Sequence, residues 1–143
     1  MTQFLAGMAP AFGCHADREF WPRVDISYFD RCGGDEWAEW SREAAIEHEA
    51  QSDWTHEVCK LIEINAGLKV LIAYPADRNE IDAVLNKLPA IHQSRKYVSS
   101  PCKYLFIFGP GEGLDDFVAF TFDGTAVADI TGDTKITTGG AHP

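Results

Sequence analysis

A seven-residue apolar run constrains the fold of this chain more than any other feature. Residues 68–74 read Leu-Lys-Val-Leu-Ile-Ala-Tyr, in which Lys69 is the one charged side chain. A nearly continuous apolar strand is typical of a sheet that is covered on both faces. The preceding residues, 53–66, place apolar side chains at helical spacing and are followed by Gly67, a residue favoured just after a helix. Together they predict an α/β domain in which helices pack on a buried sheet.

The regions before and after the helix at 53–66 and the strand at 68–74 are predicted to add further strands and helices to the same domain. Residues 1–15 fit a short helix, and residues 23–29 alternate apolar and polar side chains as a half-buried strand does. Asp77 can cap a helix that we expect Pro89 to stop. Three more strands are predicted further on, and the last two flank a turn signal at Asp123-Gly124: 103–109, 117–122 and 125–130. The predicted order is β–β–α–β–α–β–β–β, an α/β sandwich with a mixed sheet.

Residues 36–50 are ambiguous between helix and strand. They are rich in good helix formers, so propensity alone predicts a helix. A strand before them and a capped helix after them favour an extended conformation at 44–49. The choice decides the function that can be inferred, because Glu47 and Glu49 share a face only on a strand. On a helix they would point about 200° apart.

Length and composition indicate one globular domain. The chain has 143 residues, and we expect a single domain over 1–135 followed by a flexible tail at 136–143. No apolar run reaches the length of a membrane span, and no basic region precedes an apolar core at the N-terminus, so we expect a cytoplasmic protein. The four cysteines form no Cys-x-x-Cys pair and are expected to be reduced thiols.

The formal net charge of −10 is unfavourable for binding nucleic acid, but the charge is unevenly distributed. Residues 35–63 contain nine acidic side chains, whereas residues 83–111 contain none. The acid-free stretch holds the basic residues that we expect to contact phosphates: Lys87, Arg95, Lys96 and Lys103. An acidic region beside a basic one fits a metal centre next to a phosphate-binding surface. The alternative is two solvated faces of an acidic globule.

The acidic side chains around residue 47 suggest a specific chemistry. If 44–49 is a strand beside the strand at 23–29, then Asp25, Glu47 and Glu49 can converge. Three carboxylates are a suitable oxygen donor set for a hard cation such as Mg²⁺. Metal-assisted hydrolysis of phosphodiesters is the reaction that this arrangement serves best.

The same residues resemble the PD-(D/E)XK nuclease superfamily, which has the restriction-endonuclease-like fold. In that pattern an aspartate on one strand is followed by Glu/Asp-x-Lys on the next strand, then by a helix and a buried strand. Asp25 matches the first part, Glu47-His48-Glu49 the second, and 53–66 with 68–74 the helix and strand. The resemblance covers residues 18–75 and implies an αβ sandwich with a central mixed sheet flanked by helices. It also implies a Mg²⁺- or Mn²⁺-dependent nuclease.

The resemblance also assigns roles to individual residues. Asp25, Glu47 and Glu49 would bind the metal, and Glu19 matches an acidic residue that many members carry on their first helix. Glu49 stands where the family usually has lysine, which makes this a Glu-x-Glu variant. Lys60 is the candidate for a lysine that has moved to the following helix, and the alternative is a solvated lysine paired with Glu57 or Glu63.

Three functions follow from these observations. The first is a metal-dependent nuclease acting on nucleic acid, for which DNA is the expected substrate. The second is a non-catalytic protein of the same fold that acts through protein partners, and the third is an acidic DNA mimic or inhibitor. The sequence leaves open whether a homodimer or another protein partner is involved.

Overall fold

The computed structural model describes residues 2–18, 24–31, 40–50, 54–95, 103–110 and 114–132. Its helices and strands alternate in the central part of the chain. In chain order they are α1 (Thr2–Met8), the 3-10 helix η1 (Ala9–Phe12), β1 (His15–Arg18), β2 (Ile26–Arg31), β3 (Trp40–Glu49), α2 (Trp54–Glu63), β4 (Leu68–Ala73), α3 (Arg78–Leu85), α4 (Leu88–Ser94), β5 (Lys103–Phe108), β6 (Val118–Phe122) and β7 (Val127–Asp129). The tail at 136–143, Glu19 and Lys96 lie outside the described residues.

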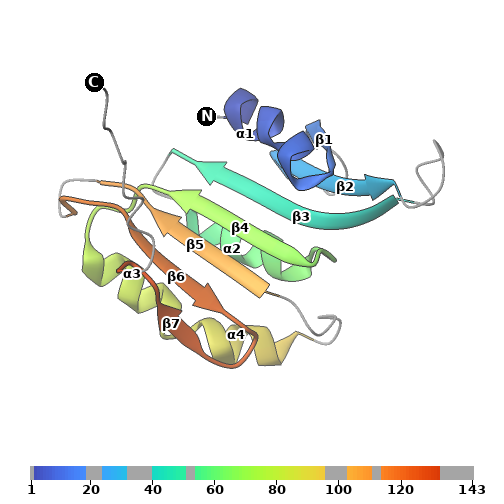
Figure 1. Cartoon of the computed structure of the whole chain (residues 1–143). Helices are drawn as coiled ribbons and strands as arrows, with labels where there is room; N and C mark the ends of the chain where they lie inside the picture. Colours follow the sequence, from blue (N-terminus) through green and yellow to red (C-terminus); the bar gives the residue numbers. More distant parts are fainter. Residues whose placement is uncertain are drawn as a thin grey trace, which may run out of the picture.

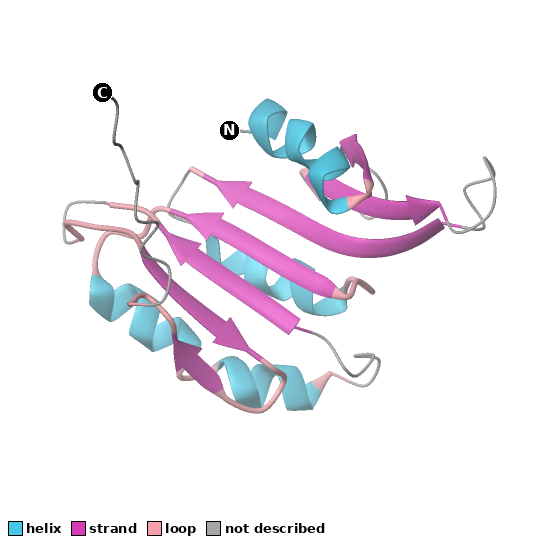
Figure 2. Ribbon diagram, in the orientation of Figure 1, coloured by secondary structure: helices cyan, strands magenta, loops and turns pink. Residues whose placement is uncertain are grey.

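The strands form one seven-stranded mixed sheet in which spatial order equals chain order, from β1 to β7. The first three strands and the last three are antiparallel neighbours, whereas β3, β4 and β5 run parallel. The parallel connections contain α2, α3 and α4, which cover one face of the sheet, while α1 and η1 lie on the other (Figure 1, Figure 2). The prediction of an α/β domain with a central mixed sheet is therefore confirmed.

The described part of the ambiguous region is a strand over Trp40–Glu49, as predicted for residues 44–49. β3 spans ten residues and is paired along both edges. Ile46 lies opposite Ile26 of β2 in antiparallel register and beside Val70 of β4 in parallel register. Backbone pairing on two sides and burial of residues 44–47 outweigh the helix propensity of this segment.

Successive side chains of β3 point to opposite faces of the sheet and so belong to two separate apolar clusters. Ala45 belongs to the larger cluster with α2, α3 and α4, whereas Ile46 belongs to a smaller one with η1. Trp54, at the start of α2, is fully buried in the larger cluster, where its ring meets Phe108 edge-on at 5.0 Å between centroids. Its indole N–H donates to Glu80 Oε1 at 2.6 Å. Trp54 is therefore a core residue that fixes the start of α2 against the sheet.

Two local predictions were wrong or incomplete. Pro89 does not stop the preceding helix but stands in the first turn of α4, which begins at Leu88. Proline is tolerated there because the first N–H groups of a helix have no intrahelical partner. The sequence also did not predict β1, which is only four residues long and pairs with β2. Such a short edge strand is specified mainly by its partner.

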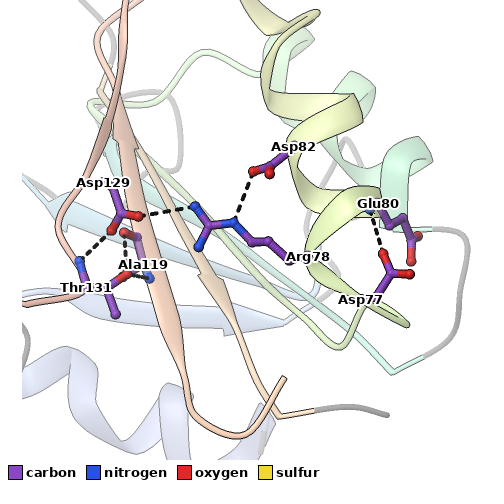
Figure 3. A network of polar contacts seen from close by, with 7 residues as sticks. All are labelled: Asp77, Arg78, Glu80, Asp82, Ala119, Asp129 and Thr131. Carbon is purple, nitrogen blue, oxygen red and sulfur yellow. Dashed lines mark hydrogen bonds and ion pairs between the residues drawn. The ribbon is translucent and has the colours of Figure 1, made fainter. Parts of the chain in front are cut away.

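Helix α3 is joined to the β6–β7 hairpin by a polar network (Figure 3). Asp77 caps the helix by accepting a hydrogen bond from the Glu80 N–H at 2.9 Å, as predicted. Arg78 then donates to Asp82 on the same helix at 3.0 Å and to Asp129 at the end of β7 at 3.3 Å. These contacts fix α3 against the last strands of the sheet.

The charged residue of the apolar run, Lys69, is 1% exposed. Its ammonium donates to the Ile62 carbonyl and to the Tyr104 hydroxyl, each at 3.2 Å. It also lies over the Tyr104 ring, 4.9 Å from the centroid. Burial of such a group lowers stability unless its contacts compensate for the lost hydration.

We predict that Lys69→Met leaves the free energy of unfolding unchanged or raises it by about 1 kcal/mol, because the apolar stem is retained and the buried charge is removed. Lys69→Ala should lower it by about 2–4 kcal/mol through the cavity that it creates. Urea denaturation of both variants measures the difference. If the two variants are equally destabilised, then the polar contacts, and not the packed stem, stabilise this position.

Candidate functional site

The candidate site lies where β3 approaches its carboxyl end. Asp25, just before β2, faces this part of β3 because Ile26 pairs with Ile46. The His48 N–H donates to Asp25 Oδ2 at 2.8 Å. The Asp25 N–H donates in turn to Glu47 Oε2 at 3.4 Å. The Asp25 carboxylate is therefore bound to the backbone of β3, and the Asp25 N–H is bound to Glu47. These two hydrogen bonds hold Asp25 and Glu47 side by side.

Helix α2 adds two charged residues, Glu57 and Lys60, three positions apart on one face. The Lys60 ammonium lies 2.7 Å from Glu47 Oε1 and 2.5 Å from Glu57 Oε2. The side chains of Glu47, Glu57 and Lys60 are 2%, 18% and 31% exposed. A lysine ammonium thus bridges a buried carboxylate on the sheet and a partly buried one on the helix. We call Asp25, Glu47, Glu57 and Lys60 the acid–lysine cluster.

Burial dominates the electrostatics of this cluster. Burial raises the pKa of Glu47 to about 7; the hydrogen bond and charge of Lys60 oppose this shift, while Glu57 and Asp25 add to it. Burial alone would lower the pKa of Lys60, but its hydrogen bonds to Glu47 and Glu57 outweigh that effect and the pKa is raised. Lys60 is therefore held in its charged form by the two glutamates.

The structure brings together three of the residues singled out from the sequence: Asp25, Glu47 and Lys60. Lys60 does not point to bulk solvent, as an ordinary surface lysine would, but reaches the buried carboxylate. Glu49 lies on the same face of β3 as Glu47 by alternation. However, the charged groups that act most strongly on Glu47 are Lys60, Glu57 and Asp25.

Glu57 is the member of the cluster whose role was not recognised from the sequence. Its spacing of three residues from Lys60 on a helix was the available signal, but it indicates only a weak surface pair. The position of α2 over β3 turns that pair into part of a buried cluster. In the described ranges, no group of three or more His, Cys, Asp or Glu side chains has the geometry to hold a metal ion as it stands.

His48 belongs to the opposite side of β3 from Glu47. Its ring meets that of Tyr74 edge-on, with centroids 5.7 Å apart and an interplanar angle of 80°. The Tyr74 hydroxyl lies 3.5 Å from His48 Nε2. His48 therefore contacts the cluster through its backbone N–H, while its ring packs against Tyr74.

Three of the basic residues predicted to contact nucleic acid lie within the described ranges, and none of them belongs to the cluster. Lys87, Arg95 and Lys103 are exposed, and Arg95 pairs with Glu63 at 2.7 Å. Lys103 opens β5 beside Leu68, the first residue of β4, whereas Glu47 lies beside Leu71, further along the parallel strands. The phosphate-binding role of these residues stays a prediction.

Comparisons of this chain with protein-family models, with curated proteins and with solved structures found no match. Among the described residues, no helix is long and apolar enough to cross a membrane. Fold and site together define the class of the protein as an α/β domain with a buried acid–lysine cluster between its sheet and its second helix.

The raised pKa of Glu47 predicts a pH-dependent stability. Between the ordinary value near 4.5 and about 7, the folded state binds more protons than the unfolded state, so the free energy of unfolding falls as pH rises. Glu47→Gln lacks this effect and should gain about 1–3 kcal/mol relative to wild type between pH 5 and pH 8. Urea denaturation across this range measures it.

Glu63→Gln is the matched control, since it removes one carboxylate from the exposed side of the same helix. If the free energy of unfolding of Glu47→Gln varies with pH just as that of wild type does, then burial does not raise the pKa of Glu47. A gain shared equally by both variants would mean that net charge, not the site, is responsible.

Proposed function

We propose that this protein is a metal-dependent nuclease of the PD-(D/E)XK type that hydrolyses phosphodiester bonds in nucleic acid, with DNA the expected substrate. The observation that carries the proposal is the position of Lys60, on the helix after β3, at 2.7 Å from Glu47. Asp25 lies just before β2, which begins at Ile26, whereas the family pattern has the aspartate on the strand itself. Glu47 on the next strand, followed by a helix and a parallel buried strand, supports the order that the sequence resemblance implies. A restriction-endonuclease-like sandwich is the finer fold that we propose on the same basis.

The donor set of the cluster fits a hard divalent cation. All of its acidic groups are carboxylates, the ligands that Mg²⁺ and Mn²⁺ prefer. Asp25 and Glu47 would hold the ion, with Glu57 or Glu49 as a further ligand. When bound, the ion would stabilise charge on the phosphate and lower the pKa of a water molecule. Glu47 Oε1 is now neutralised by Lys60, so access of a cation to that oxygen requires the ammonium to move.

The chain's own residues are arranged to support this chemistry. The backbone N–H of His48 fixes the Asp25 carboxylate in orientation, so one ligand is preorganised. Glu57 offers the Lys60 ammonium a second partner and keeps it near Glu47. The Lys60 ammonium, held in a partly buried position, could orient the scissile phosphate and stabilise its developing negative charge.

Removal of either ligand should abolish cleavage. We expect Asp25→Asn and Glu47→Gln to reduce Mn²⁺-dependent cleavage of plasmid DNA, single-stranded DNA or RNA to background, while circular dichroism shows a folded protein. Glu63→Gln should retain wild-type activity because its carboxylate lies outside the cluster. Cleavage that persists in Asp25→Asn or Glu47→Gln would mean that the activity belongs to other residues or to a contaminant.

Replacement of Lys60 separates turnover from metal binding. Lys60→Met should lower turnover by about 100-fold or more, because the cation beside the reacting phosphate is lost. Calorimetric titration with Mn²⁺ should show affinity at least equal to wild type, since the competing ammonium is gone. Lys60→Arg should retain part of the activity, and Glu49→Lys, which restores the family's usual motif, should be tolerated. Full activity in Lys60→Met would refute the role of this lysine.

A non-catalytic protein of the same fold is the second candidate. It is favoured by the internal neutralisation of Glu47 by Lys60 and by the net charge of −10. This candidate predicts that millimolar Mn²⁺ neither binds to the wild-type protein nor supports cleavage. An acidic DNA mimic would in addition bind DNA-binding proteins through exposed carboxylates of 35–63.

A further inference from the structure

The face of the sheet opposite α2, α3 and α4 carries a groove of about 540 Å³, a volume within the range of small-molecule sites. Its floor is formed by side chains of β2 to β5 and its wall by α1, η1 and the residues that follow. The main apolar lining residues are Leu5, Met8, Phe12, Ile46, Val70 and Leu105.

The groove exists because the sheet is wider than the helices that cover this face. The elements α1 and η1 together span residues 2–12 and lie over the β1–β3 side of the sheet (Figure 1). The Tyr28 hydroxyl donates to the Leu5 carbonyl and the Tyr28 ring stacks on Phe12 at 6.2 Å between centroids. These contacts fix the wall, so the groove is preformed. Phe12 itself is 64% exposed at the edge.

One end of the groove is acidic, and a β-bulge is the reason. Tyr28 pairs with Ala44, but Phe29 pairs with Arg42, so Glu43 is an extra residue in β3. A bulge redirects a side chain, and Glu43 lines the groove together with its neighbour Ala44.

A second carboxylate joins Glu43 there. Asp30 follows Tyr28 by two positions on β2 and therefore shares its face. Burial raises the pKa of the Cys14 thiol in the groove, and the charges of Glu43 and Asp30 raise it further. Both carboxylates thus act on the same space. Among the described lining residues there is no lysine, arginine or histidine.

This groove is separate from the acid–lysine cluster. On β3, Ile46 faces the groove while Glu47 faces α2, so the two sites lie on opposite faces of the sheet. An apolar cavity with two carboxylates at one end is complementary to a molecule with an apolar body and a positively charged end.

We propose that the groove binds a small amphiphilic cation, whose apolar body lies on the side chains of β3, β4 and β5 and whose ammonium lies between Asp30 and Glu43. The apolar body is bound by removal of its surface from water, and the carboxylates select the sign of the charge. This inference does not depend on the proposed nuclease activity.

Calorimetric titration of the 143-residue protein with octylammonium, octanol and octanoate, each below its micellar concentration, tests the proposal. We expect octylammonium to bind at least tenfold more tightly than octanoate, with octanol between them. The double variant Asp30→Asn/Glu43→Gln should reduce octylammonium affinity to that of octanol and leave octanol binding unchanged. The control Asp115→Asn/Asp116→Asn removes the same charge from exposed positions outside the groove and should bind as wild type does.

A groove-filling variant checks the location. Leu105→Trp, at a half-buried position, should abolish binding of octylammonium and octanol while circular dichroism shows a folded protein; Leu68→Trp serves the same purpose if the first variant does not fold. Equal affinity for octanoate, unchanged affinity in the double variant, or binding that survives filling would overturn the proposal. No binding of octylammonium, with binding of a lysine-rich amphipathic peptide, would overturn it in favour of a protein partner.

Discussion

The pairing of β3 on both of its edges is the constraint on which the rest of the structure depends. Antiparallel pairing with β2 brings Asp25 to Glu47, and parallel pairing with β4 requires a crossover, which α2 supplies. The crossover lays α2 across β3 and so carries Lys60 to Glu47. A shift of one residue in this register would turn Glu47 to the opposite face and Ile46 toward α2.

Lys69 and Lys60 differ in burial, and the difference bears on function. Lys69 is 1% exposed and donates to a carbonyl and to a hydroxyl inside an apolar core. Lys60 is partly exposed, and its ammonium forms ion pairs with both Glu47 and Glu57. A buried ion pair contributes little net stability, because desolvation offsets most of the attraction. A charge cluster kept near the carboxyl end of an interior strand, with Lys60 31% exposed, is therefore easier to explain by function than by stability.

Much of the fold could be predicted from the sequence because its central elements have strong patterns. The apolar run at 68–74 and the turn at Asp123-Gly124 specify strands and a hairpin locally. Residues 44–49 required context, since their propensity favours a helix and only pairing on two edges holds them extended. Pro89 was misread because the same residue can end one helix or begin the next.

The site was predictable only in part. Asp25, Glu47 and Lys60 could be proposed from the order of strand, strand and helix, but the part played by Glu57 depends on the rotation of α2 about its axis. The apolar groove could not be predicted, because it arises from the limited length of α1 and η1 and its acidic end from a bulge at Glu43. Side-chain rotation, bulges and uncovered faces are tertiary properties that sequence periodicity does not record.

The central proposal is that the acid–lysine cluster is a metal site, and that Lys60 pairs with Glu47 when no metal is bound. Crystals grown with Mn²⁺ test it most directly through the anomalous scattering of the metal. We expect an anomalous peak in contact with the carboxylates of Asp25 and Glu47, with the Lys60 ammonium displaced from Glu47 Oε1. A map at millimolar Mn²⁺ with no peak there, and with Lys60 still bridging Glu47 and Glu57, would contradict the claim.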